Sequence, residues 1–320
     1  MNVFEQLWGM LEPMATRVRA LVAVAAVACS VASTSAAQEA SPFPDGWIVF
    51  TADTENGVFC CSLFKLRTDG SGLRQLVGEH VDHSSPPAFA PNGRRVAFAS
   101  GGKRGPGLFA VNLDGSRLRR LTTGADTSPA YSPDGKRIAF LRRNDRSVDD
   151  VYVTEADGRG RRLRRGFPSQ GRPSWTPDGR SIVFSAIGGA YDPLYLYTVD
   201  ARTGRIEQRR ILQNNTGDPE LGVGGDALVS PDGRTVVFTG NKPTCDGCDP
   251  AYALYRKPFP RGPVRRVCDS CGADSWSSDS RVLAWGGITT VNLRVLRDGR
   301  TASVPVGGRV YAEHVALQPR

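Results

Sequence analysis

The hydrophobic residues of this chain fall in short runs that are separated by polar turn residues. Runs of β-branched and aromatic residues occupy 137–140, 181–184 and 235–238, and each follows a turn that contains aspartate and glycine. Such runs are typical of β-strands. The pattern therefore predicts an all-β protein.

A Pro-Asp-Gly phrase returns along the chain and divides it into repeats. Proline presets φ and glycine accepts a positive φ, so the phrase predicts a tight turn between two strands. Its aspartate or asparagine positions are 42 to 54 residues apart, a period that indicates one structural unit copied many times. The copies are 91–93 (Pro-Asn-Gly), 133–135, 177–179 and 231–233, with a truncated copy at 44–46 and a degraded one at 278–280.

Each repeat reads as four strands. One precedes the Pro-Asp-Gly turn, one follows it, a third lies further on (194–197 in one repeat), and a fourth follows a second Asp-Gly turn. Four-stranded units of this size predict a six-bladed β-propeller with antiparallel strands. The chain begins in the middle of a unit, at strand 47–50, and ends on 315–319, which resembles the first strand at 129–133. We expect the C-terminal strand to complete blade one and close the ring. The alternatives, an open β-solenoid or two sandwiches, would not explain the complementary half-units at the two ends.

The segment Tyr131–Phe140, together with Val151-Tyr152-Val153 and Asp157-Gly158, resembles the WD-type repeat of the TolB propeller family. The resemblance extends over 44–320. It implies the propeller fold, and the family's range covers periplasmic scaffolds, sensors and the propeller halves of peptidases. TolB itself has an α/β domain before its propeller, for which we find no counterpart here, so the resemblance does not imply TolB's role in an envelope-spanning complex.

The N-terminal residues read as an export signal. Basic residues Arg17 and Arg19, an apolar stretch and the small residues Ser35-Ala36-Ala37 follow Met14, which is an alternative start. We expect a signal peptide over 1–37, a linker over 38–43 and the propeller over 44–320, with no transmembrane span. A lipid anchor at Cys29 is an alternative to cleavage after Ser35-Ala36-Ala37. We expect the mature protein in the periplasm, at the cell envelope or outside the cell, and we expect it to be a monomer.

The net charge of +9 comes mainly from arginine, and its densest cluster is Arg159–Arg165. These residues would lie at the outer edge of a blade, where charge prevents unwanted strand addition. The alternative is a basic rim for an acidic polymer or an anionic envelope. Nucleic acid is not an expected partner, because exposed aromatic residues are not interleaved with the basic ones.

Six cysteines remain after the signal, in three close pairs. We expect disulfides, since exported proteins meet an oxidising environment; pairing across loops and pairing within each Cys-x-x-Cys both stay open. The spacing of the last four also fits a Zn site, and a redox-active pair is a third alternative. We expect no cofactor otherwise. The cysteines are Cys60, Cys61, Cys245, Cys248, Cys268 and Cys271.

Propeller topology assigns these residues to one face. Both kinds of Asp-Gly turn lie on one side of the ring, which we call the turn face. The loops between strands two and three and the loops between blades lie on the other side, the loop face. The cysteines, the histidines and the long polar loop of blade four are all expected on the loop face. The expected binding residues there are His80, His83, His314, Asn214, Asn215, Asp218 and Glu220.

The sequence favours binding over catalysis. No Gly-x-Ser-x-Gly elbow occurs, and we expect no catalytic residues. We expect an exported binding or scaffold protein of the cell envelope that recognises a protein or a glycan. The alternatives are a metal-dependent lyase or hydrolase and a redox or metal-handling envelope protein built on the blade-five cysteines. The lyase or hydrolase would use residues at the ring's mouth on the loop face, namely His80, Asp82, His83, Asp126, Asp218, Glu220 and Glu313.

Overall fold

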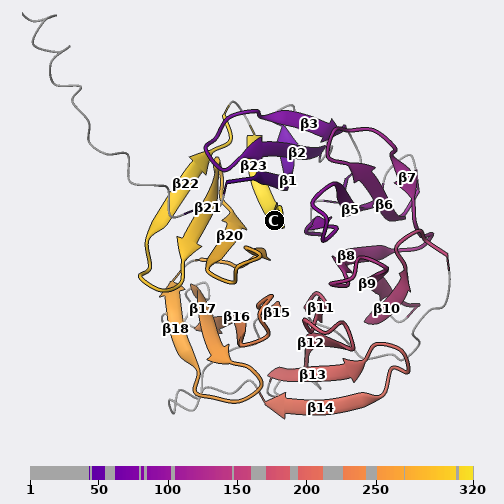
Figure 1. Cartoon of the computed structure of the whole chain (residues 1–320), viewed down its shortest axis with the longest axis vertical. Helices are drawn as coiled ribbons and strands as arrows, with labels where there is room; N and C mark the ends of the chain where they lie inside the picture. The colour runs from indigo at the N-terminus through magenta and orange to yellow at the C-terminus, as the bar shows by residue number, and fades with distance from the viewer. Residues whose placement is uncertain are drawn as a thin grey trace, which may run out of the picture. The chain divides into compact units, whose positions relative to one another are not determined.

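The computed structural model of the chain is a β-propeller over Phe43–Arg320. Six sheets are arranged around a central axis, as predicted (Figure 1). Among the described residues no helix is long and apolar enough to cross a membrane. The structure describes residues 43, 45–54, 62–78, 81–82, 85–101, 105–145, 148–159, 171–187, 194–211, 226–242, 251–269, 271–307 and 310–319.

The two strands nearest the axis flank the Pro-Asp-Gly turn. The inner strands of blades one to six are β23 (Val310–Leu317), β4 (Ala88–Phe89), β8 (Asp126–Tyr131), β11 (Ser174–Trp175), β15 (Ala227–Val229) and β19 (Ser275–Trp276). The second strands are β1 (Trp47–Thr54), β5 (Arg95–Ser100), β9 (Arg137–Arg143), β12 (Ser181–Ile187), β16 (Thr235–Lys242) and β20 (Val282–Gly286).

The two outer strands flank the second turn. The third strands are β2 (Ser62–Arg67), β6 (Gly107–Asn112), β10 (Asp149–Glu155), β13 (Leu194–Asp200), β17 (Ala251–Pro258) and β21 (Thr290–Val295). The fourth are β3 (Arg74–Val77), β7 (Arg119–Arg120), β14 (Ile206–Ile211), β18 (Arg265–Asp269) and β22 (Thr301–Pro305). The fourth strand predicted for blade three, within 159–165, lies almost wholly outside the described residues.

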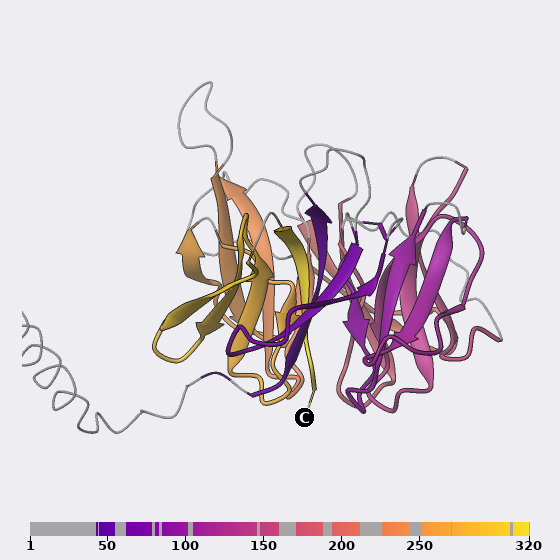
Figure 2. The ribbon, with the colours of Figure 1, turned by 90° about the horizontal axis from the view of Figure 1, so that it is seen from above.

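The ring closes as the two half-units predicted. In blade one the strand order is β23-β1-β2-β3, so the C-terminal strand lies beside the first strand of the chain. β23 pairs with β1 antiparallel, with Val315 opposite Phe50 and Leu317 opposite Ile48. The strand begins at Val310, earlier than the sequence indicated. The tight turns and the C-terminus lie together along the lower edge of Figure 2, which is the turn face.

The core repeats from blade to blade. In blades one to five the second strand contributes a phenylalanine that is at most 2 % exposed. Its ring stacks on an aromatic ring directly opposite on the third strand, with centroids 5.5 to 6.0 Å apart. Such cross-strand pairs stabilise a sheet. The pairs are Phe50–Phe64, Phe98–Phe109, Phe140–Tyr152, Phe184–Tyr197 and Phe238–Tyr255.

Candidate functional site

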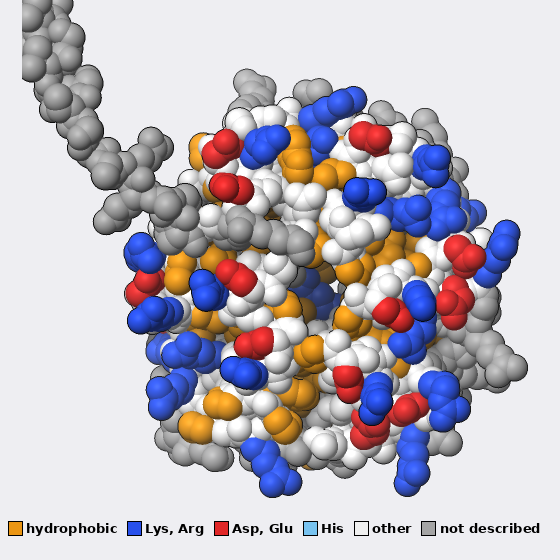
Figure 3. Space-filling view, viewed as in Figure 1, with side chains coloured by type: hydrophobic (Ala, Val, Ile, Leu, Met, Phe, Trp, Pro, Cys, Tyr) orange, Lys and Arg blue, Asp and Glu red, His pale blue; other side chains and the backbone are white. Residues whose placement is uncertain are grey.

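The inner strands enclose a cavity on the propeller axis. It measures about 350 Å³ and opens on the turn face, where Figure 3 shows a central hollow with a basic side chain at its floor. The cavity exists because one inner-strand position is small in five of the six blades. This position lies four residues before the Asp or Asn of the turn in blades two to six, and Ala316 of the closing strand is its equivalent in blade one. These residues are Ala88, Ala130, Ser174, Ser275 and Ala316, with Leu228 in the sixth.

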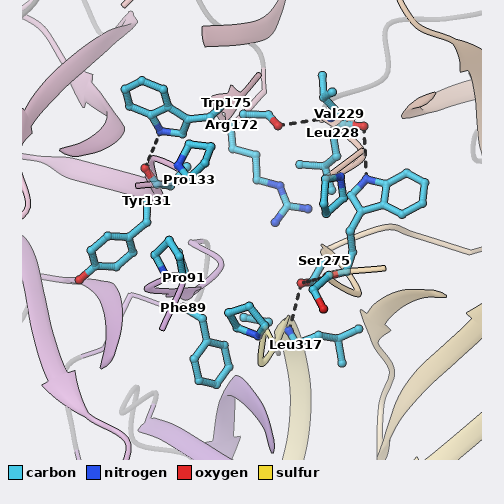
Figure 4. A pocket seen from close by; sticks show the side chains of 18 of the residues that line it. Phe89, Pro91, Tyr131, Pro133, Arg172, Trp175, Leu228, Val229, Ser275 and Leu317 are labelled. Carbon is cyan, nitrogen blue, oxygen red and sulfur yellow. Dashed lines mark hydrogen bonds between the residues drawn. The ribbon is translucent and has the colours of Figure 1, made fainter. Parts of the chain in front are cut away.

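The wall of this axial cavity is apolar because its polar atoms join neighbouring blades. Trp175 Nε1 donates a hydrogen bond to the carbonyl of Ala130 (2.9 Å), and Ser275 Oγ accepts one from the Leu317 amide (3.0 Å). Figure 4 shows both bonds. Prolines from the turns form the rim: Pro91, Pro133, Pro177, Pro231 and Pro319. The equivalent bonds in other blades are Trp276–Leu228 (3.4 Å) and Val229–Ser174 (3.3 Å).

Arg172 forms the floor of the axial cavity. It directly precedes Pro173 and β11, and its side chain is only 6 % exposed. Nη1 and Nη2 donate to the carbonyls of Asp274 (2.7 Å) and Ala273 (2.5 Å). Nε lies 3.0 Å from Asp226 Oδ2 but is not aligned for a hydrogen bond, and it has no hydrogen-bond partner among the described residues. Arg172 therefore links blades four, five and six, and its guanidinium lies at the centre of the close-up in Figure 4.

His314 and Asp274 extend this network to the closing strand. His314 Nδ1 lies 3.2 Å from Asp274 Oδ1, and Asp274 Oδ2 accepts a hydrogen bond from the Gly286 amide (3.0 Å). Burial opposes protonation of His314, but the hydrogen bond to Asp274 and its charge outweigh burial and raise the pKa of His314 above 6.5. With His314 protonated, the four side chains of the network (Arg172, Asp226, Asp274 and His314) carry balanced charges.

Of the predicted loop-face binding residues, only His314 lies in the described part of the chain. It is in the interior of β23, with its side chain 31 % exposed. The other six predicted binding residues lie outside the described residues, so that face stays a prediction. They are His80, His83, Asn214, Asn215, Asp218 and Glu220.

Two of the predicted disulfide cysteines pair within their own motif. Cys268 and Cys271 form a disulfide three residues apart in sequence. Cys268 lies in β18 and not in the loop that follows, and Cys271 is buried against Leu254 and Leu283. The other cysteines, Cys60, Cys61, Cys245 and Cys248, lie outside the described residues. Within the described residues no group of three or more His, Cys, Asp or Glu is placed to hold a metal ion.

Asp126, a candidate acid at the ring's mouth, is structural. Its side chain is fully buried and accepts two hydrogen bonds from Arg142, at 2.5 and 2.6 Å. Arg142 in turn packs over the rings of Phe140 and Tyr152. A carboxylate held in this way is not available to a substrate.

Sequence reasoning missed the axial cavity and Arg172. The available signal was positional: a charged residue occurs five or six positions before the turn aspartate in three successive repeats, as Arg172, Asp226 and Asp274. In the other repeats a proline, serine or histidine stands near this position. A charged residue at this position, next to an otherwise apolar inner strand, indicates a polar cluster on the axis.

Comparison with known proteins gives the same fold. Residues 53–163 match the TolB beta propeller domain family. TolB from Acinetobacter baumannii is 18 % identical, with 86 % of this chain and 67 % of that chain covered and a TM-score of 0.68. A protein assigned as TolB from Agrobacterium tumefaciens is 17 % identical over 87 % of this chain and all of that one (TM-score 0.57). A chain of a nidogen/laminin complex is 12 % identical, with 85 % of this chain and 98 % of that chain covered (TM-score 0.59).

No curated protein matches the sequence significantly. At these identities the structural likeness establishes the fold alone. The matched segment begins at the end of β1 and spans the third and fourth strands of blade one, all of blade two and the described strands of blade three. It includes the residues on which the sequence resemblance rests. Residues 53–163 therefore carry repeats of the TolB beta propeller family, and the chain has a TolB-like six-bladed propeller.

Proposed function

We propose that this chain is an exported binding protein of the cell envelope that recognises a partner protein without covalent chemistry, at the axial cavity. The observation that carries the proposal is the cavity itself: about 350 Å³, formed by all six inner strands, with an apolar wall and a buried cation at its floor. Concave, apolar and preformed sites with a few placed polar groups are the usual form of binding sites.

The chemistry of the cavity supports binding. Two of its three lining serines, Ser174 and Ser275, accept hydrogen bonds from backbone amides of the neighbouring blade. Among the described residues, no serine, threonine or cysteine forms a hydrogen bond with His314. A covalent mechanism requires a nucleophile beside its base, and the described residues offer none at the axis.

The size and rim of the cavity favour a protein partner. A volume of this size accommodates one or two side chains, and the rim of prolines beside Trp175 and Trp276 presents rigid apolar surfaces to them. Rigid surfaces bind with a small loss of conformational entropy. A chain of similar fold occurs in a solved nidogen/laminin complex.

The location belongs to the same proposal. Residues 1–37 have the charge and apolar pattern of an export signal, and the Cys268–Cys271 disulfide fits an oxidising compartment. An exported propeller with an open axial site would meet its partner in the periplasm, at the cell envelope or outside the cell. Processing of the native protein, read by mass spectrometry of its N-terminus, tests this part.

Filling the cavity tests the binding proposal. Ala130→Phe places a ring in the cavity, while Ala125→Phe adds the same ring at an exposed position outside it. Each variant is expressed in the native cell and chemically cross-linked there, and captured proteins are identified and quantified by mass spectrometry. We expect partners shared by the native protein and Ala125→Phe to fall at least tenfold with Ala130→Phe. Equal recovery with both variants, when both have native unfolding temperatures, would refute the axial site.

A further inference from the structure

Two basic hollows lie beside the mouth of the axial cavity. The first, of about 630 Å³, is lined by Lys65, Arg94, Arg95 and Arg117 at the boundary of blades one and two. The second, of about 410 Å³, is formed on blades two and three by Arg95, Arg119, Lys136 and Arg159. Arg95 lines both, so they form one basic surface that spans three blades.

Positive charge dominates this surface. Asp114 is the one acidic residue lining the first hollow, and Glu155 and Asp157 are the two that line the second. Asp114 Oδ1 already accepts a hydrogen bond from the Ser116 amide (2.8 Å). Across the two hollows, seven basic residues therefore outnumber three acidic ones.

Two of the three guanidinium groups of the first hollow are available to a partner. Arg94 and Arg117 are exposed, and their side chains have no hydrogen bond or ion pair within the described residues. Lys65 differs, because its ammonium donates to the carbonyl of Leu113 (2.8 Å) and lies over the Trp47 ring. Arg94 and Arg117 are thus the cations that an incoming anion would meet first.

A narrow and rigid ridge separates the first hollow from the axial cavity. Pro91 and Pro319 line the cavity, while the adjacent Gly93 and Gln318 line the hollow. Gln318 fixes the ridge: its Oε1 accepts from the Trp47 amide (3.0 Å) and its Nε2 donates to the carbonyl of Gly93 (2.9 Å). A peptide lying across the mouth would reach the hollow within a few residues.

We propose that the turn face binds an acidic protein segment that inserts one apolar side chain into the axial cavity and lays neighbouring acidic residues across the basic hollows. The proposal rests on the proposed function and names the chemistry of the partner. An apolar anchor beside several charges is the usual composition of a protein interface. Complementary charge over the hollows would raise the association rate and set specificity.

The apolar cavity separates this partner from other anions. A flat anionic lipid surface would pair with the arginines and leave the cavity unfilled. A charged glycan would offer polar sugar faces to a wall of proline, alanine and tryptophan. A peptide supplies both components at once.

A peptide-display selection on the immobilised mature protein tests the proposal. The probe is a library of random dodecapeptides, selected in parallel on the native protein and on three variants. Arg94→Glu/Arg117→Glu reverses charge at the first hollow, Arg202→Glu/Arg234→Glu makes the same change at exposed turn positions on blades four and five, and Ala130→Phe fills the cavity. Thermal unfolding confirms that each variant is folded.

We expect peptides enriched on the native protein and on Arg202→Glu/Arg234→Glu to carry an apolar residue flanked by aspartate or glutamate. A selected peptide, titrated in solution, should bind Arg94→Glu/Arg117→Glu at least tenfold more weakly and Arg202→Glu/Arg234→Glu within twofold of native. Raising salt from 50 to 200 mM should weaken its binding to the native protein severalfold, because charges are paired in the complex.

The outcomes separate this inference from the proposed function. Neutral or basic peptides that still lose binding with Ala130→Phe would overturn the acidic partner and leave the axial site intact. Peptides that bind equally to all four proteins would contradict both. Vesicles with anionic lipid and a sulfated polysaccharide serve as competing probes. If either one displaces the peptide only when Arg94 and Arg117 are native, the result supports a surface that binds through charge. Tighter binding of the lipid or the polysaccharide than of every selected peptide would overturn the choice of a protein partner.

Discussion

At the scale of single residues, the axis is held by charges that come from four blades. Arg172, Asp226, Asp274 and His314 lie 54, 48 and 40 residues apart in sequence, and each is unexceptional within its own repeat. Their contacts arise only when the ring closes, so the sequence alone did not pair them and did not single out Arg172, Asp226 or Asp274. Removing one carboxylate leaves Arg172, whose side chain is only 6 % exposed, with less counter-charge, which is costly.

His314 gives this network a pH dependence. Because its pKa is raised above 6.5 in the folded protein, its contribution to stability is fully present below about pH 6.5 and is lost as pH rises through the folded pKa. His314→Gln should lower the free energy of unfolding by about 1 kcal/mol at pH 5.5. The difference from the native protein should shrink toward pH 9. Urea unfolding across this range measures it, and a difference that grows with pH would contradict the assigned ion pair.

The disulfide gives a second test at this scale. Cys268 and Cys271 should resist alkylation of the unfolded, unreduced protein and gain two adducts after reduction, read by peptide mass spectrometry. The choice between pairing across loops and pairing within the motif was open from sequence, because four cysteines allow three connectivities. Adducts on Cys268 and Cys271 before reduction would leave the metal or redox alternatives standing.

At the scale of elements, one hydrogen-bonded turn accounts for the repeated phrase. In four blades a serine or threonine two residues before the aspartate donates to that carboxylate at 2.6 Å. The aspartate also accepts from the amide two residues on, 3.0 to 3.1 Å away. The following glycine has a positive φ in the intact copies, and in the degraded copy Ser280 adopts φ 61° itself. The local rule was readable from sequence because every partner lies within five residues.

Removing one hydroxyl should weaken this turn. Ser132 is fully buried, and its Oγ donates to Asp134 and accepts from the Arg137 amide (2.9 Å). Ser132→Ala should therefore lower the free energy of unfolding by about 1–2 kcal/mol. Ser132→Thr should restore it, since Thr176 makes the same bonds in blade four. Chemical unfolding at neutral pH decides, and an Ala variant as stable as native would show that the hydroxyl contributes nothing.

The same turn predicts sensitivity to acid. The hydrogen bond from Ser132 and then that from the Lys136 amide lower the pKa of Asp134 below 3.8, and Asp178 is lowered in the same way. A lowered carboxyl pKa adds stability above the unfolded value, and this is lost as pH falls through the folded pKa. Asp134→Asn should therefore lower the free energy of unfolding at pH 7. When the pH falls below 4, the variant should lose less of its remaining stability than the native protein loses.

At the scale of the whole molecule, closure joins the two ends of the chain. The half-units at each end predicted the pairing of β23 with β1, because an inner strand was missing from one and spare in the other. The fold was predictable since the repeat carries its own strands and turns. The axial cavity was not, because its size depends on how side chains from six blades, five of them small, meet around one axis.

A buried charge in the closing strand should destabilise the whole ring. Val315 is fully buried opposite Phe50, so Val315→Asp should cost more than about 3 kcal/mol. Arg297→Asp, at an exposed turn of blade six, is the matched control and should change stability by less than about 1 kcal/mol. Hydrogen exchange followed by mass spectrometry should show faster exchange in all six blades. Faster exchange confined to blade one would mean that the blades fold independently.

The most direct test of the axial site is hydrogen exchange of the native protein with and without a peptide selected on it. We expect protection at the ends of the inner strands and the turns that follow, in 127–135, 174–180 and 228–234. The loop-face ends of β12 and β16 should remain unchanged. Protection confined to the loop face, with those three segments exchanging as in the free protein, would contradict binding at the axial cavity.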